Sequence, residues 1–399
     1  MQMKEEHAPQ CPFDHVDGQG LEPQLRHLLH NEPVARVRLA YGEGPVWIVT
    51  RYEDVKLVTT DRRFSRAALV GKDFPRITPR PIAPPGSIFV LDPPEHGRMR
   101  TALGRAFAPR SLDRMRELTQ RVVDELLDDF EAAGGPADLM AALATPLPTR
   151  VISQILGIPA DERQWLKEQA AALKMTDPSN QPLATAAQKA LHDYVISLLE
   201  RRRREGGDDL VSALAIPPDQ AEGLTDGELV SLIVSLILTG HDNLTNEVGG
   251  ICYALLTDPD LLDRAKEDLA EILDELIRYI PYRRGVGTPR VALEDVTVGG
   301  RTIRAGEIVH VSYIAANQDP DRFPGPDRID PDRSRVPNLA FGWGTHRCPA
   351  EPLARIELLV AVRTLLQRFP NLRLAVPANE VPWESRNVNR LPLSLPVLW

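Results

Sequence analysis

The stretch FGWGTHRCPAEPLA at residues 341–354 contains Cys348, one of only three cysteines in the chain. Gly342 and Gly344 precede Cys348, and His346 lies two residues before it. Glycine can adopt backbone conformations closed to other residues and lets the chain pass close to a ligand. A cysteine in this setting could be a nucleophile, a metal ligand or a packed side chain.

A helical pattern begins just after Cys348, so the sulfur is expected at or just before a helix N-terminus, where a thiolate is stabilised. A nucleophile needs a base, and His346 has no orienting carboxylate near it in sequence. Zinc needs several Cys or His ligands, and the chain has no second close pair. A single thiolate fits an axial haem ligand. A packed cysteine remains the alternative.

The segment LTGHDNLTNE at 238–247 places polar residues after an apolar run, and this is the second candidate for chemistry. Thr225 and Glu228 form a capping-box pattern, and Asp258-Pro259 is a stop signal. We therefore predict one helix of about 32 residues, roughly 48 Å long. Gly240 costs about 1 kcal/mol relative to Ala in a helix interior, so a packing reason or a close ligand is expected there.

The remaining chain must position these two segments. Its residue pattern predicts a β-hairpin at 35–50, a helix at 52–60 and a long loop over 64–90. From 93 to about 275 the pattern is that of nearly continuous helix. Within that region, Ser111 is the expected N-cap of a helix that stops at Gly134. Strands are expected around Gly299-Gly300 and Ala305-Gly306, then a final helix over 351–369. The predicted fold class is mainly α with a minor β region, and residues 1–399 are expected to form a single domain.

Composition limits the functional class. The formal net charge of −9 argues against a nucleic-acid binder. Three cysteines give no disulfide framework, which is typical of a reducing compartment. The polar N-terminus has no signal-peptide pattern. The longest apolar run, 229–238, is shorter than the about 20 residues that span a bilayer. A soluble cytoplasmic protein, without membrane contact, is therefore expected.

FGWGTHRC resembles the haem-binding loop of the cytochrome P450 family, Phe-Gly-x-Gly-x-His-x-Cys. Four further segments resemble the family's motifs in the right order over nearly the whole chain, and this order makes the set specific. They are DELIRY for Glu-x-x-Arg, LDPPEHGRMR for His-x-x-x-Arg, TPRVALEDVTVGG for the strand with a propionate-binding arginine, and DPDRFPGPDRIDPDR for the meander.

The resemblance implies the cytochrome P450 fold, with haem b between the long central helix and the cysteine loop. It implies Cys348 as the axial thiolate, and Glu275 and Arg278 as a buried ion pair braced by Arg322. Ala350 replaces the glycine usual two residues after the cysteine, and a methyl group there should be tolerated. The implied cofactor-binding residues are His96, Arg100, Arg290, Phe341, Gly342, His346 and Cys348.

The resemblance also places Asp242 and Asn243 on the distal side of the haem as catalytic residues. Asp242 aligns with the family's acid and could relay protons or form a salt bridge. Asn243 replaces the threonine that normally helps to guide protons to bound dioxygen. Three readings stay open: Asn243 takes over this role, Thr245 substitutes for it, or the reaction needs less proton control, as in radical coupling.

The implied function is a bacterial class I monooxygenase that oxidises a secondary-metabolite natural product with O2. Electrons would come from a ferredoxin or flavodoxin with its reductase, and the protein would be a monomer. The substrate hypothesis is a cyclodipeptide (diketopiperazine), hydroxylated or coupled through radicals. The alternatives are macrolide or terpenoid hydroxylation, or a non-catalytic haem sensor or carrier. By analogy the substrate pocket is lined by Ser87, Ile88, Phe89, Val90, Thr176, Asn180, Thr239, Gly240, Val286 and Asn387.

Overall fold

The computed structural model describes residues 18–78, 86–173, 178–215, 223–240, 242–333, 336–384 and 388–399, without the side chains of residues 105, 106 and 178. The chain forms two compact units. Unit 1 comprises Met1–Pro85, Phe89–Asp92 and Asp274–Cys348, and unit 2 comprises Gly86–Ile88, Pro93–Leu273 and Pro349–Trp399. The chain is mainly helical with small sheets, which confirms the predicted fold class. That residues 1–399 act as a single domain stays a prediction.

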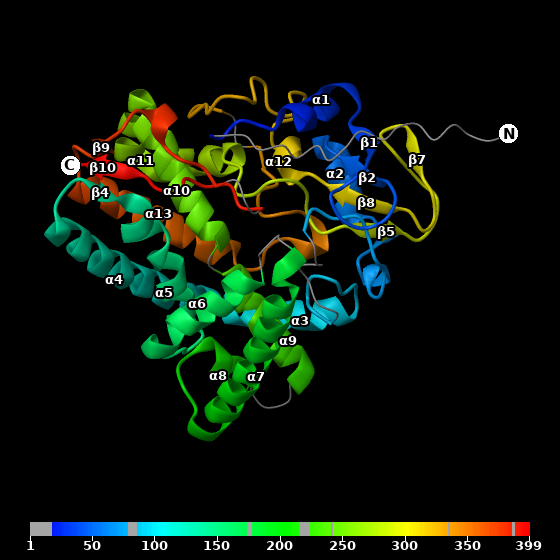
Figure 1. The fold of residues 1–399 in the computed structure, drawn as a ribbon, viewed down its shortest axis with the longest axis horizontal. Helices are drawn as coiled ribbons and strands as arrows, with labels where there is room; N and C mark the ends of the chain where they lie inside the picture. The colour runs from blue at the N-terminus through cyan, green and yellow to red at the C-terminus, as the bar shows by residue number, and fades with distance from the viewer. Residues whose placement is uncertain are drawn as a thin grey trace. The chain divides into compact units, whose positions relative to one another are not determined.

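Unit 1 is built on a five-stranded sheet with the order β1-β2-β8-β5-β3 (Figure 1). β2 pairs antiparallel with β1 and parallel with β8, and β5 is antiparallel to β8 and β3. The expected hairpin and the helix over 52–60 are confirmed. The elements of unit 1 are α1 (Pro23–Asn31), β1 (Val34–Val37), β2 (Val46–Val49), α2 (Tyr52–Thr60), β3 (Phe64–Ser65), η1 (Ala67–Leu69), β5 (Arg290–Ala292), β6 (Val296–Val298), β7 (Arg301–Ile303), β8 (Ile308–Val311), α12 (Tyr313–Ala316) and η5 (Gly344–His346).

Helix α2 contacts both this sheet and the loop that leads to Cys348. Its apolar face packs into a buried cluster with the sheet and with Phe323 and Leu339 of that loop. The Tyr52 hydroxyl donates to the Pro337 carbonyl across 2.6 Å, and the Tyr52 amide donates to Asp319 Oδ2 across 2.9 Å. The ring of Tyr52 meets Phe323 edge-on at 5.8 Å. The loop is therefore anchored by both apolar packing and hydrogen bonds.

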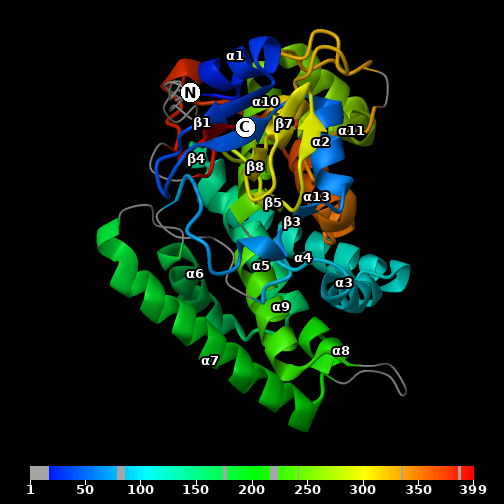
Figure 2. The same cartoon turned by 90° about the vertical axis from the view of Figure 1, so that its right-hand side faces the viewer.

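Unit 2 is helical, with α13 packed along α4 (Figure 1) and α7 packed against α6 and α9 (Figure 2). A three-stranded sheet with the order β4-β10-β9 includes the last strand of the sequence, β10. Helix α11 begins in unit 2, and its last residues from Asp274 belong to unit 1. The elements are α3 (Glu95–Ala106), α4 (Pro109–Ala133), β4 (Ala137–Asp138), η2 (Met140–Ala144), α5 (Pro146–Ile155), η3 (Ala160–Glu162), α6 (Arg163–Ala172), η4 (Pro178–Asn180), α7 (Gln181–Glu205), α8 (Leu210–Ala215), α9 (Asp226–Thr239), α10 (Asp242–Thr257), α11 (Pro259–Tyr279), α13 (Glu351–Arg368), β9 (Arg373–Leu374), η6 (Ala378–Glu380) and β10 (Pro396–Leu398).

The N-terminus of α4 corrects the prediction that Ser111 is its N-cap. The cap is Ala108, and Pro109 stands in the first turn. Proline suits that position because its ring fixes a helical φ and the missing N–H would have no partner there. The expected stop at Gly134 is confirmed, with φ at +70°.

The prediction of one unbroken helix from Thr225 to Asp258 is wrong at Gly240. The capping box of Thr225 and Glu228 is present, but α9 ends at Thr239 and Gly240 is its C-cap. A Cβ on Gly240 would lie 2.7 Å from a side-chain carbon of Ile152 in α5, so the glycine permits close packing of the helices. The Thr239 hydroxyl donates back to the Ser235 carbonyl, as side chains at helix ends often do. Helix α10 begins at Asp242.

None of the helices in the described part of the chain combines the length and the apolar character needed to cross a membrane.

Candidate active site

The loop before Cys348 is folded back on itself by backbone hydrogen bonds. The Cys348 amide donates to the Phe341 carbonyl across 2.8 Å, and the Arg347 amide donates to Gly344 across 3.1 Å. Gly342 and Gly344 have φ of +76° and +73°. A Cβ on Gly344 would lie only 2.4 Å from the Thr59 carbonyl oxygen of α2. Both the conformation and the contact with α2 therefore require glycine at 344.

Cys348 is half-buried and lies two residues before Ala350, the N-cap of α13. A helix therefore begins just after Cys348 in the sequence, as predicted, and a helix N-terminus favours a thiolate. Ala350 has φ of −93°, an ordinary conformation for any residue. The backbone at this position does not require glycine, so the methyl group causes no conformational strain.

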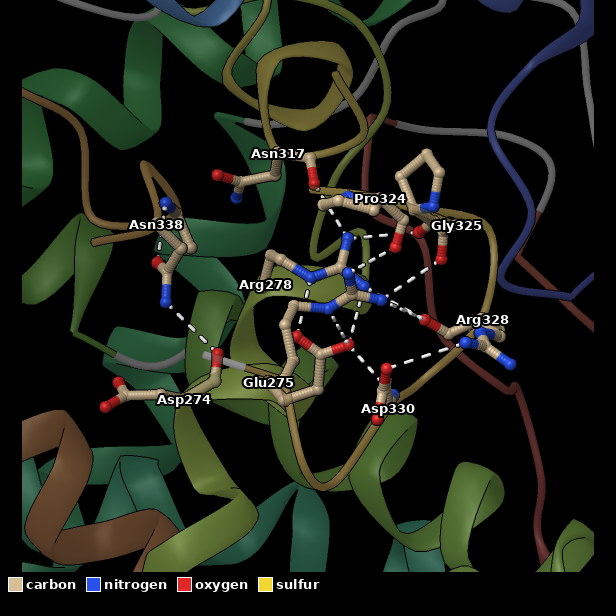
Figure 3. Close-up of polar contacts among 12 residues, drawn as sticks. Asp274, Glu275, Arg278, Asn317, Pro324, Gly325, Arg328, Asp330 and Asn338 are labelled. Carbon is tan, nitrogen blue, oxygen red and sulfur yellow. Dashed lines mark hydrogen bonds and ion pairs between the residues drawn. The ribbon is translucent and has the colours of Figure 1, made fainter. Parts of the chain in front are cut away.

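Glu275 and Arg278 form a buried bidentate ion pair in the last turns of α11, as predicted (Figure 3). Arg278 donates from Nε to Oε2 and from Nη2 to Oε1, both across 2.7 Å. The remaining donors of Arg278 reach the carbonyls of Asn317, Pro326 and Arg328 at 2.7 to 3.0 Å. This pair therefore holds the loop over 317–333 against α11.

The residue that braces this pair is Arg333, and the prediction of Arg322 is wrong. Arg333 Nε donates to Glu275 Oε1 across 2.9 Å, and its Nη1 donates to the Pro324 carbonyl across 2.6 Å. The Asp330 amide also donates to Glu275 Oε1, which brings the following turn to the carboxylate. Arg322 instead lies over the Tyr52 ring, 5.3 Å from its centroid.

Two arginines of unit 1, Arg66 and Arg290, are almost completely buried, at 5% and 2% exposure. Burial first, and then the nearby charge of Arg290, lower the pKa of Arg66 to about 9. Among the described residues, Arg66 Nε and Arg290 Nη2 have no hydrogen-bond acceptor. Sequence reasoning found Arg290 and missed Arg66, since a single arginine after a short strand gives no periodic signal.

The other expected cofactor ligands lie in both units. His96 is buried on α3 of unit 2, and Arg100 lies one helical turn further on the same face. Phe341 and His346 are half-buried in the cysteine loop of unit 1. That all of these side chains bind one cofactor stays a prediction.

The expected catalytic residues stand in the first turn of α10, with Asp242 half-buried and Asn243 exposed. Thr245, by contrast, is buried. One turn beyond Asn243, sequence reasoning missed Glu247, which is buried and whose pKa is raised well above the ordinary value by desolvation. Glu357 on α13 is buried and shifted in the same way. The signal that could have identified these residues is a glutamate at a core-facing position of an apolar helix.

Eight of the predicted substrate-pocket residues are described. Ser87 and Ile88 are buried in unit 2, and in unit 1 Val90 is buried and Phe89 half-buried. Val286 packs in the apolar cluster of β1 and β2. Asn180 is the N-cap of α7, Thr239 is exposed and Gly240 half-buried. Thr176 and Asn387 lie outside the described residues.

A cavity of about 890 Å³ within unit 2 lies among α3, α4 and α8. Its walls include Arg98, Arg114, Leu118 and Leu210. It contains none of the residues predicted to line the substrate pocket, so we do not identify it with that pocket.

The chain resembles characterised proteins over almost its entire length. It is 44% identical over 392 residues to nocardicin C N-oxygenase of Nocardia uniformis subsp. tsuyamanensis, covering 97% of this chain and 98% of that protein. It is 42% identical over 393 residues to mycinamicin IV hydroxylase/epoxidase of Micromonospora griseorubida, with the same shares covered. The chain belongs to the cytochrome P450 family.

Two further comparisons agree with this membership. The family model described as Cytochrome P450 matches residues 269–382, a range that includes the Glu275–Arg278 pair and Cys348. The crystal structure of cytochrome P450mel 107F1 with biaryl coupling reactivity has a TM-score of 0.95 and 48% identity, covering 98% of this chain and 100% of that chain.

Membership establishes a monooxygenase whose cofactor is haem, with the Cys348 thiolate as axial ligand. Because the relatives are oxygenases, the alternative of a non-catalytic haem carrier is set aside. The residues present fit the cofactor. Haem has carboxylate groups, and within the described part of unit 1 the buried Arg66 and Arg290 each have a donor without an acceptor. These are the groups that an anion would satisfy.

Proposed function

We propose that this cytochrome P450 oxidises a compact, amide-bearing natural product and that its preferred substrate is a cyclodipeptide. The oxidation is a hydroxylation or a radical coupling. Electrons come from a ferredoxin or flavodoxin with its reductase, in the cytoplasm. The single observation that carries the substrate proposal is the polar start of α10, where Asn243 stands in place of the threonine usual in the family.

The cofactor ligands follow from the same proposal. Cys348 binds the iron as a thiolate, favoured by the N-terminus of α13. His96, Arg100, Arg290 and His346 would donate hydrogen bonds to the haem carboxylates, and Phe341 and Gly342 would let the loop pass close to the ring. Thiolate-ligated haem supplies the activation of dioxygen.

The protein's own polar groups then control protons and orient the substrate. Asp242, in the first turn of α10, holds or passes a proton at its carboxylate. The Asn243 amide both donates and accepts hydrogen bonds, so it can hold water or a substrate amide. Ser87 supports an amide-bearing substrate, since it is buried and its hydroxyl has no partner among the described residues. A buried hydroxyl of this kind recognises a polar substrate group.

A second candidate is oxidative coupling of aromatic rings, and one observation favours it. The relative with 48% identity and a TM-score of 0.95 is described as having biaryl coupling reactivity. Coupling joins two substrate radicals, so no oxygen atom enters the product. It therefore needs less control of proton delivery, in agreement with the loss of the threonine at position 243.

A spectral titration of the haem protein tests the substrate class. Cyclodipeptides, phenolic aromatics, macrolides and terpenoids are added separately, and displacement of the distal water shifts the Soret band. The proposal predicts saturable shifts with cyclodipeptides. If only phenolic compounds give the shift, and turnover yields dimers that lack two hydrogens, the coupling candidate replaces the cyclodipeptide. Turnover with ferredoxin and reductase, against reductase alone, tests the electron donor.

A further inference from the structure

Arg66 and Arg290 place two cations in one buried region of unit 1. Ser65 of β3 lies opposite Val291 of the antiparallel strand β5, so Arg66 and Arg290 are the next residues along two adjoining strands, and the charge of Arg290 contributes to the lowered pKa of Arg66. A buried charge is stable only when it is paired and hydrogen-bonded. The question is therefore which anion this region is built to hold.

Asp92 is an acid that interacts electrostatically with Arg66, and both of its oxygens already accept hydrogen bonds from other donors. Asp92 Oδ1 accepts from the Arg66 amide across 3.0 Å, and Oδ2 accepts from the Ser65 hydroxyl and from the Ala67 amide. The guanidinium of Arg66 donates instead to the Phe89 carbonyl, from Nη1 across 3.1 Å. Arg290 Nη1 reaches only the Thr288 carbonyl, across a long 3.4 Å. Within the described part of unit 1, no carboxylate neutralises either guanidinium by direct contact.

The pair lies beside the cysteine loop. Burial and the charge of Arg290 lower the pKa of Arg66, and the nearby Tyr313 side chain partly offsets both effects. The Tyr313 hydroxyl oxygen would lie 3.6 Å from a Cβ placed on Gly342, the first glycine of that loop. Arg66, Tyr313 and Gly342 are all in unit 1, so this neighbourhood does not depend on how the two units are arranged.

We propose that Arg66 and Arg290 together bind one haem carboxylate, and that Arg66 links that carboxylate to the Phe89 carbonyl. Arg66 is thus a positioning residue with two contacts, one to the cofactor and one to the segment Phe89–Asp92. This inference rests on the proposed haem contacts of Arg290. It adds a second cation and a connection to a segment predicted to line the substrate pocket.

The connection has a consequence for that segment. The carboxylate fixes the guanidinium of Arg66, and the guanidinium holds the Phe89 carbonyl. The backbone of residues 89–92 is therefore more ordered when haem is bound. A substrate that contacts Phe89 or Val90 then binds to a segment whose backbone conformation the bound haem has already fixed.

The test compares Arg66→Gln, Arg66→Lys and the control Arg63→Gln in the haem-loaded protein. Arg63 is close in sequence, but its side chain is 43% exposed and pairs with Asp61. Haem loss is followed by transfer to apomyoglobin. A charge-assisted hydrogen bond contributes about 1.5–3 kcal/mol, so Arg66→Gln is expected to release haem at least about tenfold faster. Arg63→Gln is expected to behave as the wild type.

Two readouts separate positioning from a merely structural role. Loss of a cation near the haem makes the midpoint potential more negative in Arg66→Gln, and Arg66→Lys restores it because the charge remains. Hydrogen exchange at the amides of residues 89–92 is slower in the wild type than in Arg66→Gln. Wild-type haem loss, potential and exchange in Arg66→Gln would overturn the proposal. Faster haem loss from Arg66→Gln with an unchanged midpoint potential would also overturn it. So would weaker substrate binding by Arg66→Gln than by the wild type when the two proteins lose haem at the same rate.

The carbon monoxide spectrum distinguishes the failure of this inference from that of the proposed function. Arg66→Gln is expected to keep the strongly red-shifted Soret band of thiolate ligation, since Cys348 is untouched. If the wild type itself lacks that band, the haem-thiolate assignment fails. If the band is present and Arg66→Gln retains haem normally, only the role of Arg66 is wrong.

Discussion

The Nε atom of Arg333 lies 2.9 Å from Oε1 of Glu275, on the same carboxylate that binds Arg278. The side chain of Arg333 is 7% exposed, so this is a buried contact. Residues 324–333 are therefore held to α11 through one carboxylate and two guanidinium groups. The Asn317 side chain extends the connection by accepting from the Leu339 amide, just before the cysteine loop.

Arg333→Gln is expected to destabilise the protein by about 1.5–3 kcal/mol, because it removes a charge-assisted hydrogen bond from a buried carboxylate that Arg278 still neutralises. Arg322→Gln is the matched control in the same loop. It loses only a cation–π contact at an exposed position, worth about 0.5–1 kcal/mol. Urea unfolding followed by far-UV circular dichroism measures both. Equal losses in the two variants would contradict the assignment of Arg333 as the brace.

Gly344→Ala is expected to lower haem occupancy sharply, because the new methyl group meets the Thr59 carbonyl oxygen at 2.4 Å. The control is Gly300→Ala in the turn between β6 and β7. Gly300 has φ of +78° and nothing near its Cβ position. Both substitutions carry the left-handed strain of about 1–2 kcal/mol, and only Gly344→Ala adds the collision. Haem content per protein after purification is the readout, and similar occupancy in both variants would show that the contact with Thr59 is unimportant.

Glu247→Gln is expected to make the protein more stable at neutral pH. Burial raises the pKa of Glu247, so the folded state keeps a proton that the unfolded state has released above about pH 4.3. Stability then falls as pH rises from that value toward the folded-state pKa. Glutamine removes this loss of stability at neutral pH. At acid pH, Glu247→Gln is expected to be no more stable than the wild type.

Unfolding midpoints between about pH 4 and pH 8 measure this effect, with Glu117→Gln as the control at an exposed position on α4. A constant difference between Glu247→Gln and the wild type across the range would mean that Glu247 is not a buried neutral acid.

Cys252 is expected to resist alkylation in the native protein. It is 2% exposed, and burial raises the pKa of its thiol to about 12, while the thiolate is the reactive form. Iodoacetamide labelling at about pH 8 with peptide mass spectrometry is expected to modify Cys252 only after unfolding. Cys348 becomes reactive once haem is removed. Rapid native labelling of Cys252 would show that α10 opens readily.

The sequence predicted those parts of the fold whose signals are local. The capping box of Thr225 and Glu228, the hairpin of β1 and β2, helix α2 and helix α13 are as expected. The cysteine loop was predictable because its glycines serve backbone conformations that few other residues adopt. Glu275 and Arg278 were found through the resemblance of DELIRY to the family's Glu-x-x-Arg motif, since their spacing on one helix face would equally fit a surface pair.

The remaining features depend on contacts that spacing does not encode. Arg322 and Arg333 occupy one loop, and only the turn at Asp330 decides which of them reaches Glu275. The break at Gly240 reflects the close approach of Ile152 from another helix. The sequence did not identify Arg66, because its importance arises from its nearness to Arg290. That residue is 224 positions later and lies in a different element.

The carbon monoxide difference spectrum tests the central claim, that Cys348 binds the haem iron as a thiolate, most directly. Purified protein is reduced with dithionite under carbon monoxide, beside a Cys348→Ser variant with wild-type far-UV circular dichroism. We predict a strongly red-shifted Soret band in the wild type and its absence in Cys348→Ser. A wild type without the band, or a folded Cys348→Ser variant that retains it, would contradict the account.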